Sequence, residues 1–352
     1  MTLPFQQPVP HMLAKAAPSI PEGAQWLYEP KWDGFRCLVF WDGSDIYLQS
    51  RDLKPLGRYF PEVEAALKRV LPGPMVLDGE IVIAGDNGLE FDSLQMRLHP
   101  AASRVKMLSE QTPASFVAFD LLAIGDEDLR NVPFEHRRES LVAALARVEP
   151  PVFLTPCTDD HVEAQDWFER FEGAGLDGVI AKPRKDAYQP GKRGWLKIKH
   201  LRTVDCVIGG YRWNRGEEGK SVGSLLLGLF DYNGVLHHVG HTSSFKAAEK
   251  RELVATLQPY VIEESEDGFG KGRTPGEPSR WTADRDMTWV RLRPELVCEV
   301  TFDYLQGANG PGARFRHAAT FQRWRLDKAP ADCTFEQIET TPPYELQQIF
   351  GR

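Results

Sequence analysis

The chain of 352 residues contains little cysteine and no long apolar run. Its five cysteines are far apart in the sequence and form no C-x-x-C pair, which favours free thiols in a reducing compartment. Apolar runs such as Leu225–Leu227 are far shorter than the roughly 20 residues of a membrane helix, and no early stretch resembles a secretory signal. We therefore expect a cytoplasmic protein with no membrane partner.

The chain also lacks an excess of positive charge, since 42 basic and 50 acidic side chains give a formal net charge of −8. Taken alone, this balance argues against a polyanionic partner, because phosphate contacts depend on Lys and Arg. The distribution is uneven, however. Seven basic residues and one acidic residue lie between Lys182 and Lys199, and five basic and one acidic lie between Arg314 and Lys328. Because electrostatic contacts decay over about 8–10 Å, these segments predict local basic surfaces that suit nucleic acid.

The hydrophobic content of 42% is enough for two cored domains. In the first 200 residues, apolar or alternating runs bounded by Gly, Asp or Pro predict strands over 37–41, 76–84 and 116–123. Helical spacing of apolar residues predicts helices over 136–148 and 164–174. This half of the chain is therefore expected to be a mixed α and β domain.

After about Lys199 the pattern changes to short strands separated by turn residues, over 205–213, 224–232, 235–242 and 296–304. One helix is expected over 246–261, and the Gly-, Pro- and charge-rich stretch 263–278 is expected to be an exposed loop. Several short strands with one helix suggest a small β-barrel. We place the domain boundary near residue 200, which gives domains 1–200 and 201–352.

Five short segments place charged residues beside apolar strand patterns, where an unpaired charge would be costly. They are EPKWDGFR (29–36), VLDGEI (76–81), FVAFDL (116–121), DGVIAK (177–182) and WLKIK (195–199). In the last segment, Lys197 and Lys199 have strand spacing, so both ammonium groups point to one face. Each segment alone has an ordinary reading, such as a surface lysine at Lys31 or a core phenylalanine at Phe119.

The order and spacing of these segments resemble the nucleotidyltransferase motifs of the ATP-dependent DNA ligases, and most closely those of the short bacterial repair ligases (ligase C and the ligase module of ligase D). The resemblance extends from Glu29 to Lys328, because the segment Arg314–Lys328 resembles the last motif of the family. K-x-D-G-x-R alone is a weak pattern, whereas five motifs in order are a specific one. The resemblance implies an α+β nucleotidyltransferase domain, with antiparallel sheets and flanking helices, followed by a β-barrel OB-fold domain.

The resemblance also implies a reaction. Lys31 would attack the α-phosphate of ATP and form a covalent lysyl-AMP, with release of pyrophosphate. AMP would then pass to the 5′-phosphate of nicked double-stranded DNA, and the 3′-hydroxyl would displace it. A lysine attacks only when deprotonated, and cationic neighbours favour the neutral amine. Lys197, Lys199 and a Mg or Mn divalent cation would supply this field and offset the charge that develops on the phosphate.

By position in the motifs, Phe119 resembles the aromatic residue that stacks on adenine, and Glu29 lies where the family contacts the base. The other nucleotide contacts that the resemblance implies are Arg36, Arg51, Glu80 and Lys182. The cation would be held by Asp177 and Glu80, because carboxylates suit a hard cation. Asp177 departs from the glutamate that is usual in the family and is one methylene shorter, so coordination through water and a structural helix-end cap are alternatives for it.

In the last motif, the resemblance implies that Arg316, Arg325 and Lys328 orient the pyrophosphate leaving group. They would do so from an OB domain that swings over ATP and then rotates away. More residues separate Arg316 from Arg325 than the family pattern leads us to expect. A basic edge strand is the alternative reading of this segment.

Other protein classes use the same lysine motif. Capping guanylyltransferases and RNA ligases are alternatives, and so is a nucleic-acid-binding OB module with an inactive transferase domain. The sequence of 29–36 and the Arg-x-Asp-Lys ending favour a DNA ligase, and the presence of Lys31, Glu80, Lys197 and Lys199 argues against an inactive domain. The short stretch before Glu29 leads us to expect a minimal, monomeric repair ligase that works with repair proteins.

Overall fold

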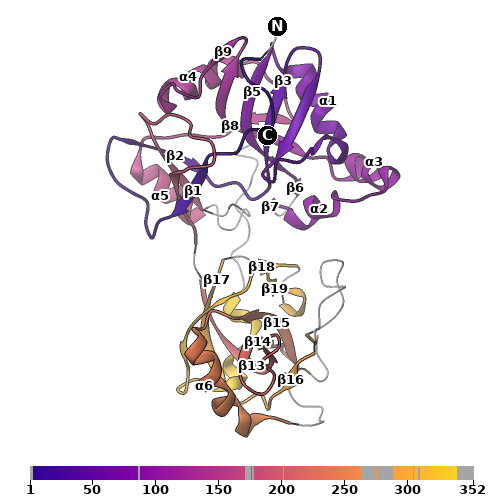
Figure 1. Cartoon of the computed structure of the whole chain (residues 1–352), viewed down its shortest axis with the longest axis vertical. Helices are drawn as coiled ribbons and strands as arrows, with labels where there is room; N and C mark the ends of the chain where they lie inside the picture. The colour runs from indigo at the N-terminus through magenta and orange to yellow at the C-terminus, as the bar shows by residue number, and fades with distance from the viewer. Residues whose placement is uncertain are drawn as a thin grey trace. The chain divides into compact units, whose positions relative to one another are not determined.

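The computed structural model describes residues 3–85, 88–170, 176, 178–200, 202–262, 269, 274–275, 288–303, 305–307 and 310–338. These residues form two compact units, one ending at His200 and the other running from Arg202 to Ile338 (Figure 1). Residues 339–352, which we assign to the second domain from the sequence, lie outside the described residues. None of the described helices is long and apolar enough to cross a membrane.

The first unit is built around a sheet with the strand order β10-β8-β5-β3-β4, and β9 (Glu127–Asp128) pairs with β8. Its strands are β3 (Phe35–Trp41), β4 (Ile46–Ser50), β5 (Met75–Val82), β8 (Ser115–Ile124) and β10 (Val152–Leu154). The strands predicted over 37–41, 76–84 and 116–123 are β3, β5 and β8. All pairs are antiparallel except β8 with β10 at the edge.

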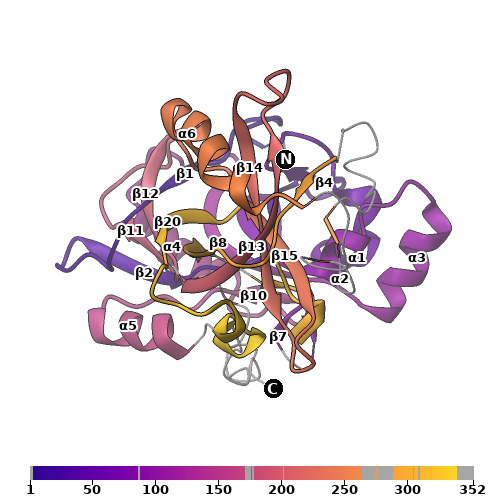
Figure 2. The same ribbon diagram turned by 90° about the horizontal axis from the view of Figure 1, so that it is seen from below.

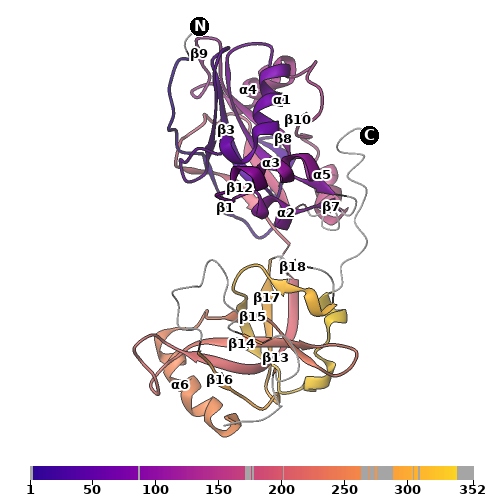
Figure 3. The same ribbon diagram turned by 90° about the vertical axis from the view of Figure 1, so that its right-hand side faces the viewer.

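Helices cover one face of this sheet, and they are α1 (Pro61–Val70), α2 (Phe91–Met96), α3 (Ala102–Gln111) and α4 (Phe134–Ala144). Figure 3 shows α1 and α4 beside the strands of this sheet. Leu67 of α1 and Leu141 of α4 share one buried cluster with Val39 and Leu77 of the sheet. The helix predicted over 136–148 is therefore present, but it ends at Ala144. Its N-terminal half packs against β8 because Phe134 and Arg137 are buried there.

A second, smaller sheet has the strand order β1-β12-β11-β2. Its strands are β1 (Leu13–Ala16), β2 (Trp26–Pro30), β11 (Val179–Pro183) and β12 (Arg193–Ile198). Only the pair of β1 with β12 is parallel among the pairings of these strands. Helix α5 (His161–Arg170) covers the outer face, where Trp167 packs with Tyr28 and Val179. The helix predicted over 164–174 is α5, and residues 171–174 lie outside the described residues.

The other faces of the two sheets are directed at each other. Phe40, Val76 and Phe119 of the larger sheet share a buried cluster with Trp195 of the smaller sheet, and Ile180 packs against it. Strand side chains alternate between faces, so residues two positions away from these point the same way. By this alternation, Arg36 and Lys197 are directed into the space between the two sheets.

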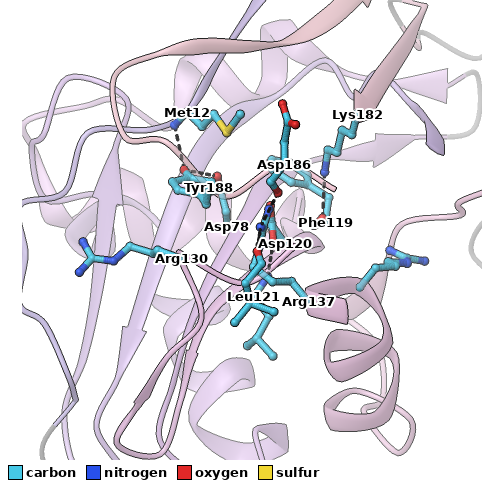
Figure 4. A network of polar contacts seen from close by, with 12 residues as sticks. Met12, Asp78, Phe119, Asp120, Leu121, Arg130, Arg137, Lys182, Asp186 and Tyr188 are labelled. Carbon is cyan, nitrogen blue, oxygen red and sulfur yellow. Dashed lines mark hydrogen bonds and ion pairs between the residues drawn. The ribbon is translucent and has the colours of Figure 1, made fainter. Parts of the chain in front are cut away.

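A fully buried ion pair ties α4 to the larger sheet. Nε and Nη2 of Arg137 donate to Oδ1 and Oδ2 of Asp120, each over 2.8 Å. Nη1 of Arg137 also donates to the carbonyl oxygens of Val132 (2.6 Å) and Asp186 (3.1 Å) (Figure 4). Both charged side chains are fully buried. Loss of the cation would leave an uncompensated carboxylate in the interior.

Arg137→Met is therefore expected to lower the free energy of unfolding by about 3–5 kcal/mol. Urea denaturation followed by far-UV circular dichroism measures this. The matched control is Arg170→Met, because Arg170 pairs with Asp166 and both side chains are 46% exposed. Exposed helix pairs contribute only about 0.3–0.5 kcal/mol. Equal losses of unfolding free energy in Arg137→Met and Arg170→Met would contradict the structural role of the buried pair.

The second unit is a sheet with the strand order β15-β14-β13-β17-β20, and β16 (Val290–Arg291) pairs with β13. Its strands are β13 (Arg202–Trp213), β14 (Val222–Phe230), β15 (Leu236–Thr242), β17 (Val297–Phe302) and β20 (Thr320–Trp324). Thr242 forms a bridge with Ala319, directly before β20, and the Ala319 N–H donates to the His241 carbonyl (2.9 Å). This bridge joins the two ends of the strand path, and it confirms the predicted barrel.

Two short hairpin pairs complete the described strands, β6 (Ala84–Gly85) with β7 (Gly88–Leu89) and β18 (Leu305–Gln306) with β19 (Arg314–Phe315). Helix α6 (Ala247–Leu257) lies beside β14 (Figure 2). It adds Leu253 and Leu257 to the barrel core. The helix predicted over 246–261 is thus present, but it ends at Leu257 and is followed by a 3-10 turn, Gln258–Tyr260.

Phe269 corrects the expectation of an exposed loop over 263–278. Its side chain is fully buried in the barrel core, although most of that stretch lies outside the described residues. A Cβ at Gly209 or Gly228 would come within 2.6–2.7 Å of the Phe269 ring. These two glycines therefore leave the space that the ring fills, and the Gly-rich composition of the loop hid an aromatic core residue.

Candidate active site

The smaller sheet presents the predicted cationic residues toward the larger sheet. Ile180 in β11 is paired with Glu29 in β2 on one side and with Lys197 in β12 on the other. Trp195 belongs to the cluster between the sheets, and Lys197 and Lys199 follow it at intervals of two. The strand alternation therefore directs Lys197 to the same side as Trp195, whereas Lys199 lies one residue beyond the end of β12.

Lys31 directly follows β2, and its backbone N–H donates to the carbonyl oxygen of Gly178 over 2.8 Å. Gly178 has a φ of +126°, and a Cβ there would overlap the carbonyl oxygen of Ile198. Only glycine combines this backbone conformation with so close an approach. Gly178 therefore holds Lys31 beside the end of β12, where Lys199 lies. Asp177 lies outside the described residues.

Glu29 and Lys182 form a buried ion pair, with 2.7 Å between Oε2 and Nζ. Their side chains are 3% and 1% exposed. Nζ of Lys182 also donates to the carbonyl oxygen of Phe119 (2.9 Å) and lies 4.7 Å from the centre of its ring (Figure 4). Burial raises the pKa of Glu29, although the charges of Lys182 and Arg138 oppose this rise. Lys182 thus fixes the Glu29 carboxylate beside Phe119.

The second carboxylate oxygen of Glu29 is a buried acceptor. Within the described part of the chain, Oε1 accepts no hydrogen bond and lies 3.8 Å from Nη1 of Arg138, which also makes none there. A buried polar atom without a hydrogen bond carries a desolvation cost of about 1–3 kcal/mol. A ligand N–H group next to Glu29 would remove this cost.

Arg36 in β3 forms a bidentate pair with Asp78 in β5, with Nε–Oδ1 at 3.0 Å and Nη2–Oδ2 at 2.6 Å. Burial raises the pKa of Asp78, but the charge and hydrogen bonds of Arg36 outweigh this and hold the pKa below its usual value. The guanidinium carbon lies 5.1 Å from the centre of the Phe119 ring and 4.8 Å from that of Trp195. Arg36 and Phe119 are among the predicted site residues, whereas Asp78 is not, although it lies two residues before Glu80 in the same acidic segment.

Glu80 is paired with Arg36 across β3 and β5. Burial raises the pKa of Glu80 to about 8, against the lowering effect of the Arg36 and Lys31 charges, while Asp33 and Asp78 add to the rise. Among the described residues, no group of three or more His, Cys, Asp or Glu side chains is placed to hold a metal ion. A cation at Glu80 would therefore need further ligands from Asp177, from phosphate or from water.

Arg51 directly follows β4 and is exposed. It lies one position beyond Ser50, which pairs with Cys37 of β3, next to Arg36. The structure therefore brings Arg51 to the same end of the sheet as Arg36, where a ligand can reach it.

The last predicted motif lies in the second unit. Arg316 follows β19, and Arg325 and Lys328 follow β20. Nη1 of Arg325 donates to both oxygens of Asp205 (2.8 and 2.9 Å), and Nε and Nη2 donate to Asp327 (both 2.9 Å). The hydrogen bonds from Arg325 lower the pKa of Asp327 to about 2. Asp205 is not among the predicted site residues, and its one signal in the sequence is an acid directly before the apolar run Cys206–Ile208.

Two family profiles together match most of the chain. The profile of the ATP dependent DNA ligase domain matches residues 11–199, and that of the ATP dependent DNA ligase C terminal region matches residues 218–328. The chain belongs to the ATP-dependent DNA ligases. This confirms the predicted family, the predicted two-part fold and the predicted class of enzyme. The roles of individual residues stay predictions.

Relatives of this ligase support the same assignment. It is 48% identical over 361 aligned residues to DNA ligase C of Mycobacterium tuberculosis, with 99% of each chain covered. It is 30% identical over 293 residues to the multifunctional non-homologous end joining protein LigD of Mycobacterium bovis, over 78% of this chain and 37% of the relative. A solved structure of a Lig E DNA ligase has a TM-score of 0.55 at 18% identity, covers 89% of this chain and 99% of its own, and shows the same fold.

The raised pKa of Glu80 predicts how stability depends on pH. Between its ordinary pKa of 4.5 and the folded-state value of about 8, the folded ligase keeps a proton that the unfolded chain has lost. Stability is therefore lost as the pH rises through this window. Glu80→Gln cannot titrate, so its melting temperature at a pH of about 8 should exceed that of the wild type by about 2–4 °C, the shift that about 1 kcal/mol produces in a domain of this size.

Differential scanning fluorimetry in a metal-free buffer with a chelator measures this difference, which should shrink toward a pH of about 5. The matched control is Glu163→Gln, because Glu163 is exposed on α5. A difference between Glu80→Gln and wild type that does not change with pH would contradict the prediction.

Proposed function

We propose that this ligase seals nicks between a 5′-phosphate and a 3′-hydroxyl in double-stranded DNA through a lysyl-AMP on Lys31 and a DNA-adenylate. The observation that carries the proposal is the gathering of the motif residues between two sheets. Lys31 follows β2 next to Gly178, and the charge of its amine acts on Glu80 of the opposite sheet. Arg36 lies 5.1 Å from the centre of the Phe119 ring, and Lys182 bonds both Glu29 and the Phe119 carbonyl.

The buried acceptor on Glu29 supports adenine as the base. With the ring stacked on Phe119, which is 8% exposed, the 6-amino group of adenine would donate to Oε1 of Glu29. Guanine carries a carbonyl oxygen at that position, and two acceptors would then face each other at a buried site. This difference favours ATP over GTP and therefore a ligase over a capping guanylyltransferase.

In the first step, the neutral amine of Lys31 attacks the α-phosphorus of ATP, a P–N bond forms, and the P–O bond to pyrophosphate breaks. Lys197 of β12 and Lys199, which directly follows it, would offset charge on the phosphate oxygens. A divalent cation, Mg²⁺ or Mn²⁺, held by Glu80 and Asp177, would supply further positive charge at the phosphates. Arg51 and Arg36 would contact the nucleotide beside it.

In the second step, an oxygen of the DNA 5′-phosphate attacks the same phosphorus, and Lys31 leaves as an amine. In the third step, the 3′-hydroxyl attacks the phosphorus of the 5′-phosphate, and AMP leaves. Exposed basic residues near the two late motifs supply the positive charge for the DNA backbone, and they include Lys185, Lys192, Arg193, Arg314 and Arg323.

We also propose that Arg316, Arg325 and Lys328 contact the pyrophosphate leaving group. Arg325 is held by Asp205 and Asp327, so its contact with pyrophosphate requires the exchange of at least one of these ion pairs. The similarity to an end-joining protein supports a role in DNA repair, with repair proteins as partners of a monomeric ligase.

Transfer of label from ATP tests the proposal. Incubation with ATP labelled at the α-phosphate, followed by denaturation and electrophoresis, should leave label on the wild-type protein and reduce it to background in Lys31→Ala, because the nucleophile is lost. The matched control is Lys15→Ala, since Lys15 is exposed on β1.

The labelled protein is then incubated with nicked DNA, with a nicked RNA–DNA hybrid or with RNA that has a 5′-diphosphate end. Of these three acceptors, nicked DNA should receive the label. Undiminished label on Lys31→Ala would overturn the mechanism. Transfer of label to the RNA 5′-diphosphate end in preference to nicked DNA would overturn the substrate.

A further inference from the structure

We propose that Tyr188 is a positioning residue for Arg36 in the adenylation reaction, acting through the carboxylate of Asp78. The inference rests on the proposed function, in which Arg36 contacts the nucleotide. Tyr188 lies between β11 and β12, ten residues before Ile198 at the end of β12. It lies within the basic segment Lys182–Lys199 but outside the five predicted motif segments.

A directed chain of hydrogen bonds joins Tyr188 to Arg36. The hydroxyl of Tyr188 donates to Oδ2 of Asp78 over 2.7 Å, and the same oxygen accepts from Nη2 of Arg36 over 2.6 Å. The backbone N–H of Met12 donates to the Tyr188 oxygen over 2.9 Å (Figure 4). A backbone N–H can only donate, so the hydroxyl proton of Tyr188 is left for Asp78. The carboxylate is thus oriented from one side by Tyr188 and orients Arg36 on the other.

A ligand can reach this chain of hydrogen bonds at Arg36. Tyr188 and Asp78 are buried, whereas the side chain of Arg36 is 17% exposed. The ring of Trp195 stands edge-on to Tyr188 and to Phe119, with ring centres 6.0 and 6.1 Å apart. Tyr188 therefore helps to fix the guanidinium relative to the ring on which the adenine would stack.

Tyr188 is itself held by segments that are distant in the sequence. Its backbone N–H donates to the carbonyl oxygen of Arg130 over 2.7 Å. The segment that contains Met12 is held at Val9, whose N–H and carbonyl both bond the buried amide of Gln49 in β4 (3.0 and 2.6 Å). The hydroxyl therefore has a fixed position, which a positioning role requires.

The neighbouring imidazole does not replace Tyr188. His11 is buried beside Asp78, and neither of its ring nitrogens forms a hydrogen bond with the described residues. Burial lowers the pKa of His11 to about 4, so the ring is neutral at neutral pH. Removal of the Tyr188 hydroxyl would thus leave Oδ2 of Asp78 without its second donor, and the carboxylate could rotate and carry Arg36 with it.

The test compares two substitutions that remove the same atom. Tyr188→Phe deletes the hydroxyl next to Asp78, and Tyr28→Phe deletes a hydroxyl that donates to the carbonyl oxygen of Pro21 over 2.6 Å from an equally buried ring. We expect the KM for ATP in self-adenylation to rise about 10- to 100-fold in Tyr188→Phe, the range of one charge-assisted hydrogen bond, and less than about twofold in Tyr28→Phe. Melting temperatures verify that both variants fold.

A double-mutant cycle separates positioning from a general structural role. In an Arg36→Lys background, which lacks the fork that Asp78 orients, Tyr188→Phe should raise the KM by less than about twofold. Equal KM values for Tyr188→Phe and Tyr28→Phe would overturn the inference, and so would an undiminished effect in the Arg36→Lys background. Failure of the wild type to label with ATP would instead overturn the proposed function.

Discussion

A charged side chain buried inside the N-terminal unit must be paired, and the unit is organised around this constraint. Three buried carboxylates each have a cationic partner, in the pairs Asp120–Arg137, Glu29–Lys182 and Asp78–Arg36. An unpaired charge in such surroundings costs several kcal/mol, so an arrangement that separates any of these partners is strongly disfavoured. The pairs therefore determine which strands and helices meet, and they do so around the space assigned to the nucleotide.

The same pairs make the site rigid before a ligand arrives. Lys182 fixes one oxygen of Glu29 and leaves the other as an acceptor without a described hydrogen-bond donor. Asp78 fixes Arg36 while part of its guanidinium stays exposed. An adenine amino group would donate to the second oxygen of Glu29, and the rest of the nucleotide would contact the exposed part of Arg36. Preorganised charges of this kind stabilise a transition state without the cost of reorganisation.

The sequence was sufficient for the strands β3, β5 and β8 and for the family, because runs of apolar residues and the order of the motifs can be read along the chain. Strand alternation also placed Lys197 on the same side as Trp195. The sequence did not show which residues, far apart in the chain, pair with one another in the fold. Tyr188 and Asp78 are 110 residues apart, and Asp205 and Arg325 are 120 apart, and no local pattern selects these pairs among many polar residues. Phe269 was hidden for a similar reason, since its place in the core depends on glycines in two distant strands.

The most direct test of this account is a crystal structure of the ligase after incubation with ATP and a divalent cation. We predict that AMP is joined to Nζ of Lys31 by a phosphoramide bond. The adenine should stack on the Phe119 ring, and its amino group should donate to Oε1 of Glu29. AMP bonded to another lysine, or an adenine bound outside the space between the two sheets, would contradict it.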